Sequence, residues 1–174
     1  MTTTATAPRA RSIAVPGNVR LAVRAVTVGD RDALGALFAR MSRESRHMRF
    51  LTSKTEFSPR ELTYLTDVDH LCHEAFVAID ERDGSMVAVA RYVWIDDRPW
   101  TAEVAAEVVD DLQGLGIGTV LAQLTVKCAR DNGFELLRAT TVADNNRARA
   151  LLRRLGFRPT RRSGRELEFA LALD

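Results

Sequence analysis

The sequence is poor in cysteine and lysine and has no long apolar run, and each of these scarcities excludes a class of protein. Cys72 and Cys128 are the only cysteines and form no CxxC pair, which favours a reducing, cytoplasmic setting over a disulfide-linked secreted domain. No segment approaches the ~18 apolar residues that a membrane-spanning helix needs. With Lys54 and Lys127 as the only lysines, Schiff-base and P-loop chemistries have few candidates. We therefore expect a cytoplasmic protein without a membrane partner.

The rest of the composition is that of a globular domain. The chain has 174 residues, of which 46% are hydrophobic and 28% charged, enough for one domain with its own core. The net charge of +2 is too small to indicate a nucleic-acid partner. Arginines nevertheless crowd the C-terminal third, which favours an anionic ligand nearby, although a solvated helix face followed by a basic turn gives the same pattern. These are Arg147, Arg149, Arg153, Arg154, Arg158, Arg161, Arg162 and Arg165.

The sequence of the first third of the chain predicts a disordered N-terminal arm, a strand and two helices. Residues 1–18 are rich in Thr, Ala and Pro without periodicity, so we expect a disordered arm before a single domain over residues 19–174. Alternation predicts a strand over residues 19–25, and Asp30 is the expected N-cap of a helix that ends near Met41. The stretch FSPRELTYLTDVD predicts a second helix that starts with a capping box.

Three β-patterned segments follow, and the chain then alternates helix, strand, helix and strand. The first two β-segments are joined by a turn with the Asp-Gly signal of a hairpin. The expected strands cover residues 74–80, 85–95, 101–111, 135–143 and 165–173, with one more short strand near Phe157, and the expected helices start at Ile117 and Ala148 and stop at Asn132-Gly133 and Gly156.

Gly114, Gly116 and Gly118 stand within five positions between an expected strand and an expected helix. Glycines there let backbone N–H groups point at an anion on the positive end of the helix. A P-loop needs a lysine directly after its last glycine, and Thr119 stands there instead. A dinucleotide site needs a different last spacing and an acidic residue about twenty positions further on, where this chain has Arg138. Both nucleotide motifs are therefore excluded.

The pattern that does fit is Q-x-x-G-x-G, and it resembles the pyrophosphate-binding loop of the GNAT superfamily of acetyl-CoA-dependent N-acetyltransferases. A second stretch, NNRARALLRRLGF, is similar to the later N-x-x-A…G-F element of that family. Three further stretches, LFARMSRESRHMRF, LTDVDHLCHEAFVAID and AEVAAEVVDDLQGLGIG, resemble the catalytic domain of Pat-type bacterial protein lysine acetyltransferases. The matching positions of the two family motifs are Gln113, Gly116, Gly118, Asn145, Ala148, Gly156 and Phe157.

The resemblance implies an α/β (α+β) GNAT fold over about residues 19 to 173. Such a fold has a mixed, mostly antiparallel sheet of six to seven strands with helices on both faces. The sheet is splayed between the fourth and fifth strands, where acetyl-CoA enters. The implied acceptor is a protein lysine, and a monomer or homodimer is expected.

The resemblance also implies a set of site residues. Glu103 matches the proposed general base of Pat-type relatives. Glu107 lies on the same strand face about 13 Å away at ~3.3 Å per residue, where those relatives usually carry an apolar residue. Asn145 either binds pantetheine or caps its own helix, and Leu152 replaces the tyrosine that protonates the leaving thiolate in many members. The implied acetyl-CoA contacts are Val108, Val109, Gln113, Gly114, Leu115, Gly116, Ile117, Gly118, Thr119, Val120 and Asn145.

Several alternatives stay open on the sequence. The same motifs serve an enzyme that acetylates a small amine or amino acid, and Leu152 is compatible with a non-catalytic acyl-CoA sensor. The HLCH stretch does not have the usual spacing of a zinc site, so no metal is expected. Tyr92, Trp94 and Trp100 are candidates either for an acceptor pocket or for the core.

Overall fold

The computed structural model describes residues 10–51, 54–95 and 98–173, which form one eight-stranded sheet in the order β1-β2-β3-β4-β5-β6-β8-β7. Every neighbouring pair is antiparallel except β5 with β6. The GNAT fold class is confirmed, with one strand more than expected. The strands are β1 (Arg11–Val15), β2 (Val19–Ala25), β3 (His73–Asp80), β4 (Met86–Trp94), β5 (Thr101–Val108), β6 (Leu136–Val142), β7 (Arg158–Ser163) and β8 (Glu166–Ala172).

The additional strand is β1, and it corrects the expected disordered arm. Ile13 of β1 lies opposite Leu21 of β2 in an antiparallel pair, so the prediction of an arm through residue 18 is wrong for this segment. Five residues at the edge of the sheet, mostly exposed, alternate too briefly to stand out from a Thr, Ala and Pro-rich context. Residues 1–9 lie outside the described residues.

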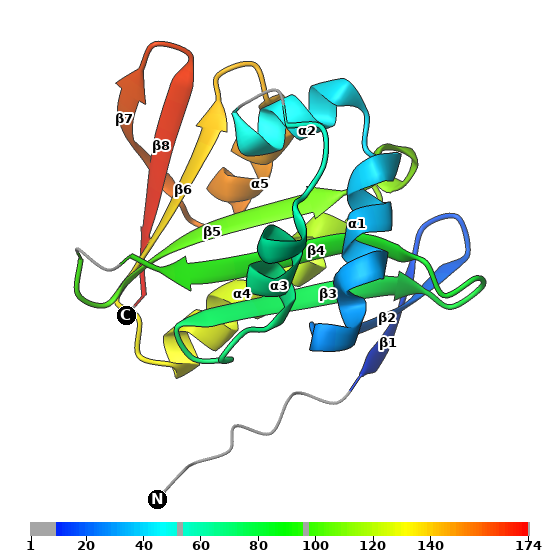
Figure 1. Cartoon of the computed structure of the whole chain (residues 1–174). Helices are drawn as coiled ribbons and strands as arrows, with labels where there is room; N and C mark the ends of the chain where they lie inside the picture. Colours follow the sequence, from blue (N-terminus) through cyan, green and yellow to red (C-terminus); the bar gives the residue numbers. More distant parts are fainter. Residues whose placement is uncertain (1–9, 52–53, 96–97, 174) are drawn as a thin grey trace, which may run out of the picture.

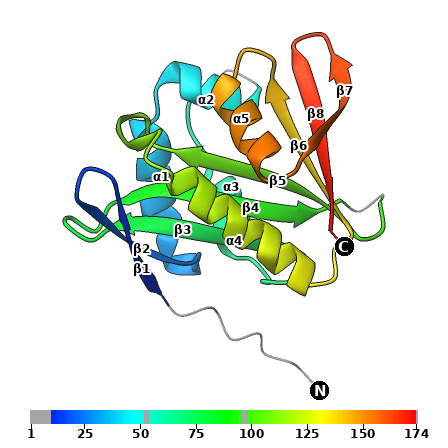
Figure 2. The same cartoon turned by 180° about the vertical axis from the view of Figure 1, so that it is seen from behind.

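Helices cover both faces of the sheet. In Figures 1 and 2, α1 and α3 lie on one face, α4 and α5 lie on the other, and α2 lies at the end where β5 and β6 separate. The central strands β3 and β4 are buried on both faces along most of their length, because helices pack on each side. No helix within the described ranges is long and apolar enough to cross a membrane. The helices are α1 (Arg31–Arg40), α2 (Arg43–Phe50), α3 (Pro59–Thr66), α4 (Ile117–Asp131) and α5 (Asn146–Arg154).

Of the two residues predicted to cap helices, Ser58 makes the expected capping hydrogen bond and Asp30 does not. Ser58 and Glu61 form the expected capping box of α3, with Pro59 in its first turn. Asp30 does precede α1, but its carboxylate caps no helical N–H group. It accepts two hydrogen bonds of 2.7 Å from the Arg24 guanidinium instead, and this pair joins β2 to the start of α1.

The parallel pair β5 and β6 opens soon after it begins, and this opening positions the site. Only Thr101–Glu103 of β5 pair with Leu136–Arg138 of β6. Beyond them the two strands diverge visibly, and β6, β7 and β8 fan away from β5 (Figure 1). The divergence lies between the fourth and fifth strands of the prediction, as the resemblance implied. The stretch 104–108 of β5 therefore has no β6 partner, and its free backbone groups are available to a ligand.

A buried histidine gives the fold an expected dependence on pH. His73 is 8% exposed at the start of β3, where burial and the nearby Arg91 guanidinium lower its pKa to about 4. In the unfolded chain a histidine takes up its proton near pH 6.5. The stability due to neutral His73 is therefore fully present above about pH 6.5 and is lost as the pH falls towards 4.

We expect the melting temperature to fall across this interval less steeply for His73→Gln than for the unchanged protein. Thermal unfolding followed by circular dichroism measures the difference. His47→Gln is the control, because His47 is an exposed residue of α2, and this variant should behave like the unchanged protein. Parallel curves for His73→Gln and the unchanged protein would refute this assignment.

Candidate active site

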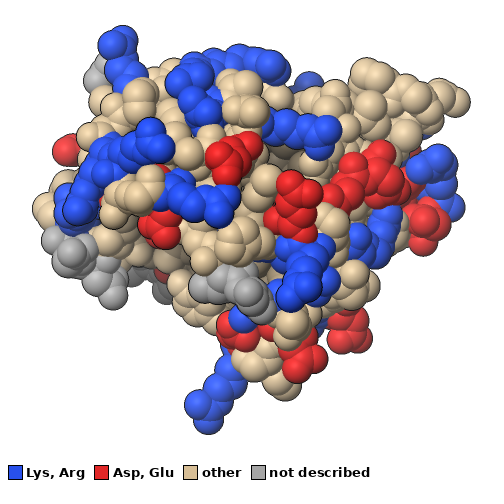
Figure 3. Space-filling view, turned by 90° about the horizontal axis from the view of Figure 1, so that it is seen from above, with Lys and Arg blue, Asp and Glu red and all other residues tan. Residues whose placement is uncertain are grey.

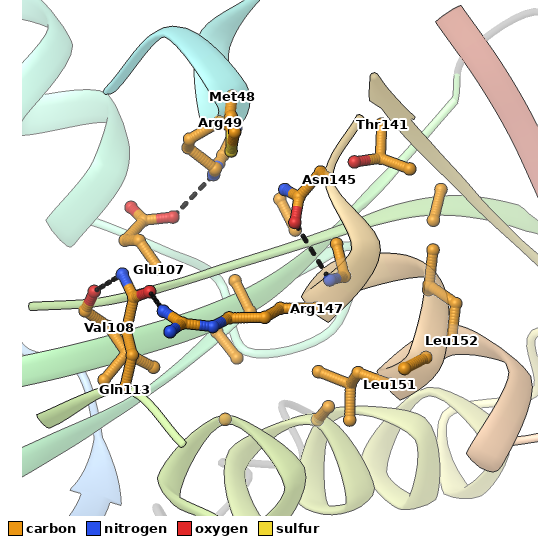
Figure 4. A pocket seen from close by; sticks show the side chains of 18 of the residues that line it. Met48, Arg49, Glu107, Val108, Gln113, Thr141, Asn145, Arg147, Leu151 and Leu152 are labelled. Carbon is orange, nitrogen blue, oxygen red and sulfur yellow. Dashed lines mark hydrogen bonds and ion pairs between the residues drawn. The ribbon is translucent and has the colours of Figure 1, made fainter. Parts of the chain in front are cut away.

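A cleft of about 950 Å³ lies at the opening between β5 and β6, within the size range of ligand sites. Its wall combines β5, the loop to α4, the first turns of α4 and α5, β6 and one side of α2. Figure 4 shows side chains from these elements converging from opposite sides. The cleft thus passes from the face that carries α4 and α5 to α2 through the gap in the sheet.

The glycine loop forms the end of this cleft at the start of α4. Gly114 and Gly116 have φ values of 82° and 87°, and Gly116 is the N-cap of α4. A Cβ atom on either glycine would meet no protein atom within 4 Å, so the backbone here is open to a ligand. The positive end of a fifteen-residue helix with bare N–H groups is suited to an anion.

The structure places most of the predicted contact residues in the cleft wall, but not all of them. Three lie outside it: Val109, Leu115 and Val120. Val109 is fully buried, and its N–H group donates to the Val87 carbonyl at 2.9 Å, while the Val120 N–H group donates to Gly116 within the helix. Residues inside the wall are Val108, Gln113, Gly114, Gly116, Ile117, Gly118, Thr119 and Asn145.

Gln113 joins three walls of the cleft. Its amide nitrogen donates to the Val108 carbonyl at 3.0 Å and to the Ser45 hydroxyl of α2 at 3.3 Å. Its amide oxygen accepts a hydrogen bond of 2.5 Å from Arg147 of α5, which reaches across the opening in Figure 4. Asp110 strengthens the same corner by accepting from the hydroxyls of Ser42 and Ser45. The loop is therefore held by side chains from both sides of the gap.

Replacing Arg147 tests the role of this bridge. For the acetyl-CoA donor that the resemblance implies, we expect Arg147→Ala to raise KM by about 5- to 10-fold with little change in kcat, because the loop loses a hydrogen bond and the cleft loses a positive charge near the expected phosphates. Steady-state kinetics with varied acetyl-CoA measures both constants. Arg153→Ala changes an exposed arginine of the same helix outside the cleft wall and should leave KM unchanged. An equal KM for both variants would contradict the proposed role.

The two carboxylates of β5 have different surroundings. Glu103 is exposed and lines the cleft, and its side chain makes no hydrogen bond or ion pair with any described residue. Glu107 also lines the cleft but is 7% exposed and pairs with Arg49 of α2, with 2.5 Å between Oε2 and Nε. Glu107 thus already uses its Oε2 atom in an ion pair, whereas both carboxylate oxygens of Glu103 are unengaged among the described residues.

The comparison with family models identifies the chain. A model described as the acetyltransferase (GNAT) family matches residues 41–157, which include the glycine loop, Glu103 and the N-x-x-A…G-F element. The chain belongs to the acetyltransferase (GNAT) family.

Individual relatives agree with this assignment. An acetyltransferase of Pseudomonas aeruginosa is 35% identical over 137 residues, which cover 78% of this chain and 73% of the relative. The acetyltransferase Pat of Mycolicibacterium smegmatis is 36% identical over 95 residues, which cover 55% of this chain and 28% of Pat. The expected similarity to Pat-type acetyltransferases is thus confirmed.

Solved structures show the same fold. The GNAT domain of S. lividans PAT superposes with a TM-score of 0.85 at 22% identity, covering 94% of this chain and 97% of that domain. The structure of yncA from Salmonella typhimurium with its cofactor acetyl-CoA superposes with a TM-score of 0.73 at 20% identity. The match covers 88% of this chain and 94% of yncA. At these identities the likeness supports the GNAT fold.

The second GNAT motif lies on α5. Asn145 caps this helix, with its side-chain oxygen 3.0 Å from the Ala148 N–H group, so its amide nitrogen remains for a ligand in the cleft. Leu152 lines the cleft and packs into the core beside Phe157, and it offers no proton to a leaving thiolate. Gly118 brings α4 close to its neighbours, because a Cβ there would lie 3.5 Å from Val108 and 3.8 Å from Leu151.

The aromatic candidates for an acceptor pocket do not line the cleft. Tyr92 is fully buried, and its hydroxyl donates to the Leu71 carbonyl and accepts from Asn132. Trp94 and Trp100 are exposed outside the cleft wall. Within the described part of the chain, no group of three or more His, Cys, Asp or Glu residues is arranged to hold a metal ion.

Sequence analysis missed α2, which forms the wall beside Glu107. Its sequence, RESRHMRF, is mostly polar and no residue of the helix is fully buried, so two apolar residues, Met48 and Phe50, were too few to stand out as an apolar stripe. The available signal is the N-cap, since Ser42 accepts from the Ser45 N–H group. Thr141 of β6 was missed too, although its buried hydroxyl lines the cleft and has no hydrogen-bond partner among the described residues. An unsatisfied buried hydroxyl in a cleft wall is a candidate ligand contact.

Proposed function

We propose that this acetyltransferase transfers the acetyl group of acetyl-CoA directly to the side-chain amine of a protein lysine. The observation that carries the proposal is the cleft, which joins an anion-binding helix start at one end to the unengaged carboxylate of Glu103 at the other. A donor with a pyrophosphate and a thioester fits this arrangement. The lysine acceptor is the one that the resemblance to Pat-type protein lysine acetyltransferases implies, and the chain is similar to Pat over 95 residues. The cysteine usage supports a cytoplasmic setting.

The donor would bind along the gap in the sheet. In the proposal, N–H groups of the loop from Gly114 to Thr119 hold the pyrophosphate. The unpaired backbone of β5 near Val108 takes the pantetheine arm. The Asn145 amide and the Thr141 hydroxyl lie on the opposite wall and can bond to the same arm. The leucines of α5 complete this wall with apolar surface.

The reaction needs a base because a lysine ammonium with pKa ~10.4 is almost wholly protonated at neutral pH. Glu103 removes that proton, directly or through water, and the free amine attacks the thioester carbonyl carbon. The carbon–sulfur bond then breaks, and the proton lost from the attacking nitrogen leaves to solvent. Coenzyme A can leave as a thiolate, since a thiol of pKa ~8.5 is a fair leaving group, so Leu152 does not block the reaction.

The charges near the cleft suit a cationic acceptor. Glu44 at the start of α2 and Glu103 are both exposed and both line the cleft. Seen from above, acidic and arginine side chains are interspersed over this end of the molecule (Figure 3). An approaching lysine therefore finds carboxylates at the cleft rather than an unbroken basic surface.

An acceptor panel tests the proposal. The protein is incubated with acetyl-CoA and with lysine-containing proteins, peptides or small amines, while thiol release is followed. Release with proteins and lysine peptides is the expected result. Release with small amines alone would replace the lysine proposal by small-molecule acetylation. Tight acetyl-CoA binding without turnover on any acceptor would indicate an acyl-CoA sensor.

A further inference from the structure

The ion pair between Glu107 and Arg49 lies in the cleft wall on the side of α2. The Glu107 side chain is 4% exposed and that of Arg49 is 20% exposed, and Figure 4 shows them meeting from β5 and α2. Met48 lies beside them in the wall. The Arg49 guanidinium also lies over the Phe50 ring, 4.6 Å from its centroid, which fixes its direction.

A second arginine lies close to the same carboxylate. Arg91 of β4 is opposite Ala105 of β5, so its side chain leaves the same face of the sheet as those of Ala105 and Glu107. Arg91 is 4% exposed, and its Nη2 atom has no hydrogen-bond partner among the described residues. Burial lowers the pKa of Arg91 to about 10, which leaves it charged at neutral pH. Arg91 lies outside the cleft wall and donates to the Leu65 carbonyl at 3.0 Å. The corner around the Glu107 carboxylate therefore holds two positive charges, Arg49 in the cleft wall and Arg91 outside it.

The acyl group of the donor must lie near this corner. If phosphates occupy the glycine loop and Glu103 serves the attacking amine, the thioester carbonyl lies over residues 104–107 of β5. The substituent of that carbonyl then faces the ion pair and Met48. This placement rests on the proposed function.

We propose that Glu107 is a specificity-determining residue that excludes acyl donors with a terminal carboxylate, such as succinyl-CoA. Without Glu107, the Arg49 guanidinium would bind such a carboxylate well through paired hydrogen bonds, and the charge of the nearby buried Arg91 would add to the attraction. Glu107 occupies Arg49 itself and places a like charge where the donor's carboxylate would lie. A neutral acetyl group needs no arginine partner and is not repelled by the Glu107 charge.

Donor binding tests the proposal without any acceptor. Succinyl-CoA and butyryl-CoA carry acyl chains of equal length and differ in the terminal charge. Calorimetric Kd values should show the unchanged protein binding succinyl-CoA at least ~10-fold more weakly than butyryl-CoA. Glu107→Gln keeps the shape and removes the charge. It should tighten succinyl-CoA by about 10-fold and leave butyryl-CoA within 2-fold.

Asp30→Asn is the matched control, since it removes another buried arginine–carboxylate pair away from the cleft. It should lower the melting temperature without changing the succinyl-to-butyryl ratio. Equal binding of the two donors by the unchanged protein would overturn the proposal, and that comparison needs no variant. The proposal would also be overturned if Glu107→Gln had the same succinyl-to-butyryl Kd ratio as the unchanged protein. Because no acceptor is present, a failed search for lysine acetylation leaves these results intact.

Discussion

Replacing Glu103 with glutamine is expected to lower kcat by at least ~100-fold while the KM for acetyl-CoA changes little. Glutamine keeps the size and the hydrogen-bonding oxygen but cannot take a proton from the acceptor ammonium. The Glu103 side chain is exposed and has no hydrogen-bond or ion-pair partner among the described residues, so the substitution breaks no side-chain hydrogen bond or ion pair. Initial rates of thiol release with varied acetyl-CoA give both constants.

Raising the pH provides a second readout for the same variant. A fraction of the acceptor amine is already neutral at high pH, so the difference between Glu103→Gln and the unchanged enzyme should shrink there. Glu166→Gln, an exposed glutamate on β8 outside the cleft wall, should be indistinguishable from the unchanged enzyme. A Glu103→Gln enzyme with unchanged kcat would remove Glu103 from the mechanism.

Replacing Gly116 with alanine should weaken acetyl-CoA binding by about 10-fold or more. Gly116 has φ of 87°, a conformation that costs an L-residue about 1–2 kcal/mol. No protein atom lies within 4 Å of the added Cβ, so the new methyl group occupies the space through which the pyrophosphate would approach the helix start. Direct titration with acetyl-CoA measures the loss.

Gly84→Ala is the control that separates loss of ligand binding from the backbone strain of an alanine at positive φ. It lies in the turn between β3 and β4 with φ of 74°, and its added Cβ would likewise meet nothing within 4 Å. Gly84→Ala should therefore lower the melting temperature about as much as Gly116→Ala without affecting acetyl-CoA binding. Equal acetyl-CoA affinities for the two variants would show that the loop does not cradle the pyrophosphate.

Much of the fold follows from local signals in the sequence. The capping box at Ser58 and the glycine after α4 mark helix ends through their own backbone chemistry. These helix ends therefore depend little on residues distant in the sequence. The β3–β4 hairpin is likewise set by its Asp-Gly turn. Two elements were missed. The exposed edge strand β1 has no such signal, and the polar helix α2 offers only the N-cap at Ser42.

The candidate site shows the same division. Glycine spacing located the loop, because a positive φ and a bare N–H surface restrict the residue type. The engagement of the two glutamates could not be predicted, since it depends on where α2 places Arg49, 58 positions away from Glu107. Val109 shows a related limit: its N–H group is used by β4, and that pairing depends on sheet register rather than on the motif.

Mass spectrometry of acceptor proteins incubated with isotopically labelled acetyl-CoA tests the central claim most directly. The labelled acetyl group should appear on lysine side chains in an amount equal to the coenzyme A thiol released, and Glu103→Gln should reduce both together. Acetyl-CoA binding without labelled lysine, or labelling that persists at full rate in Glu103→Gln, would contradict direct transfer assisted by this carboxylate.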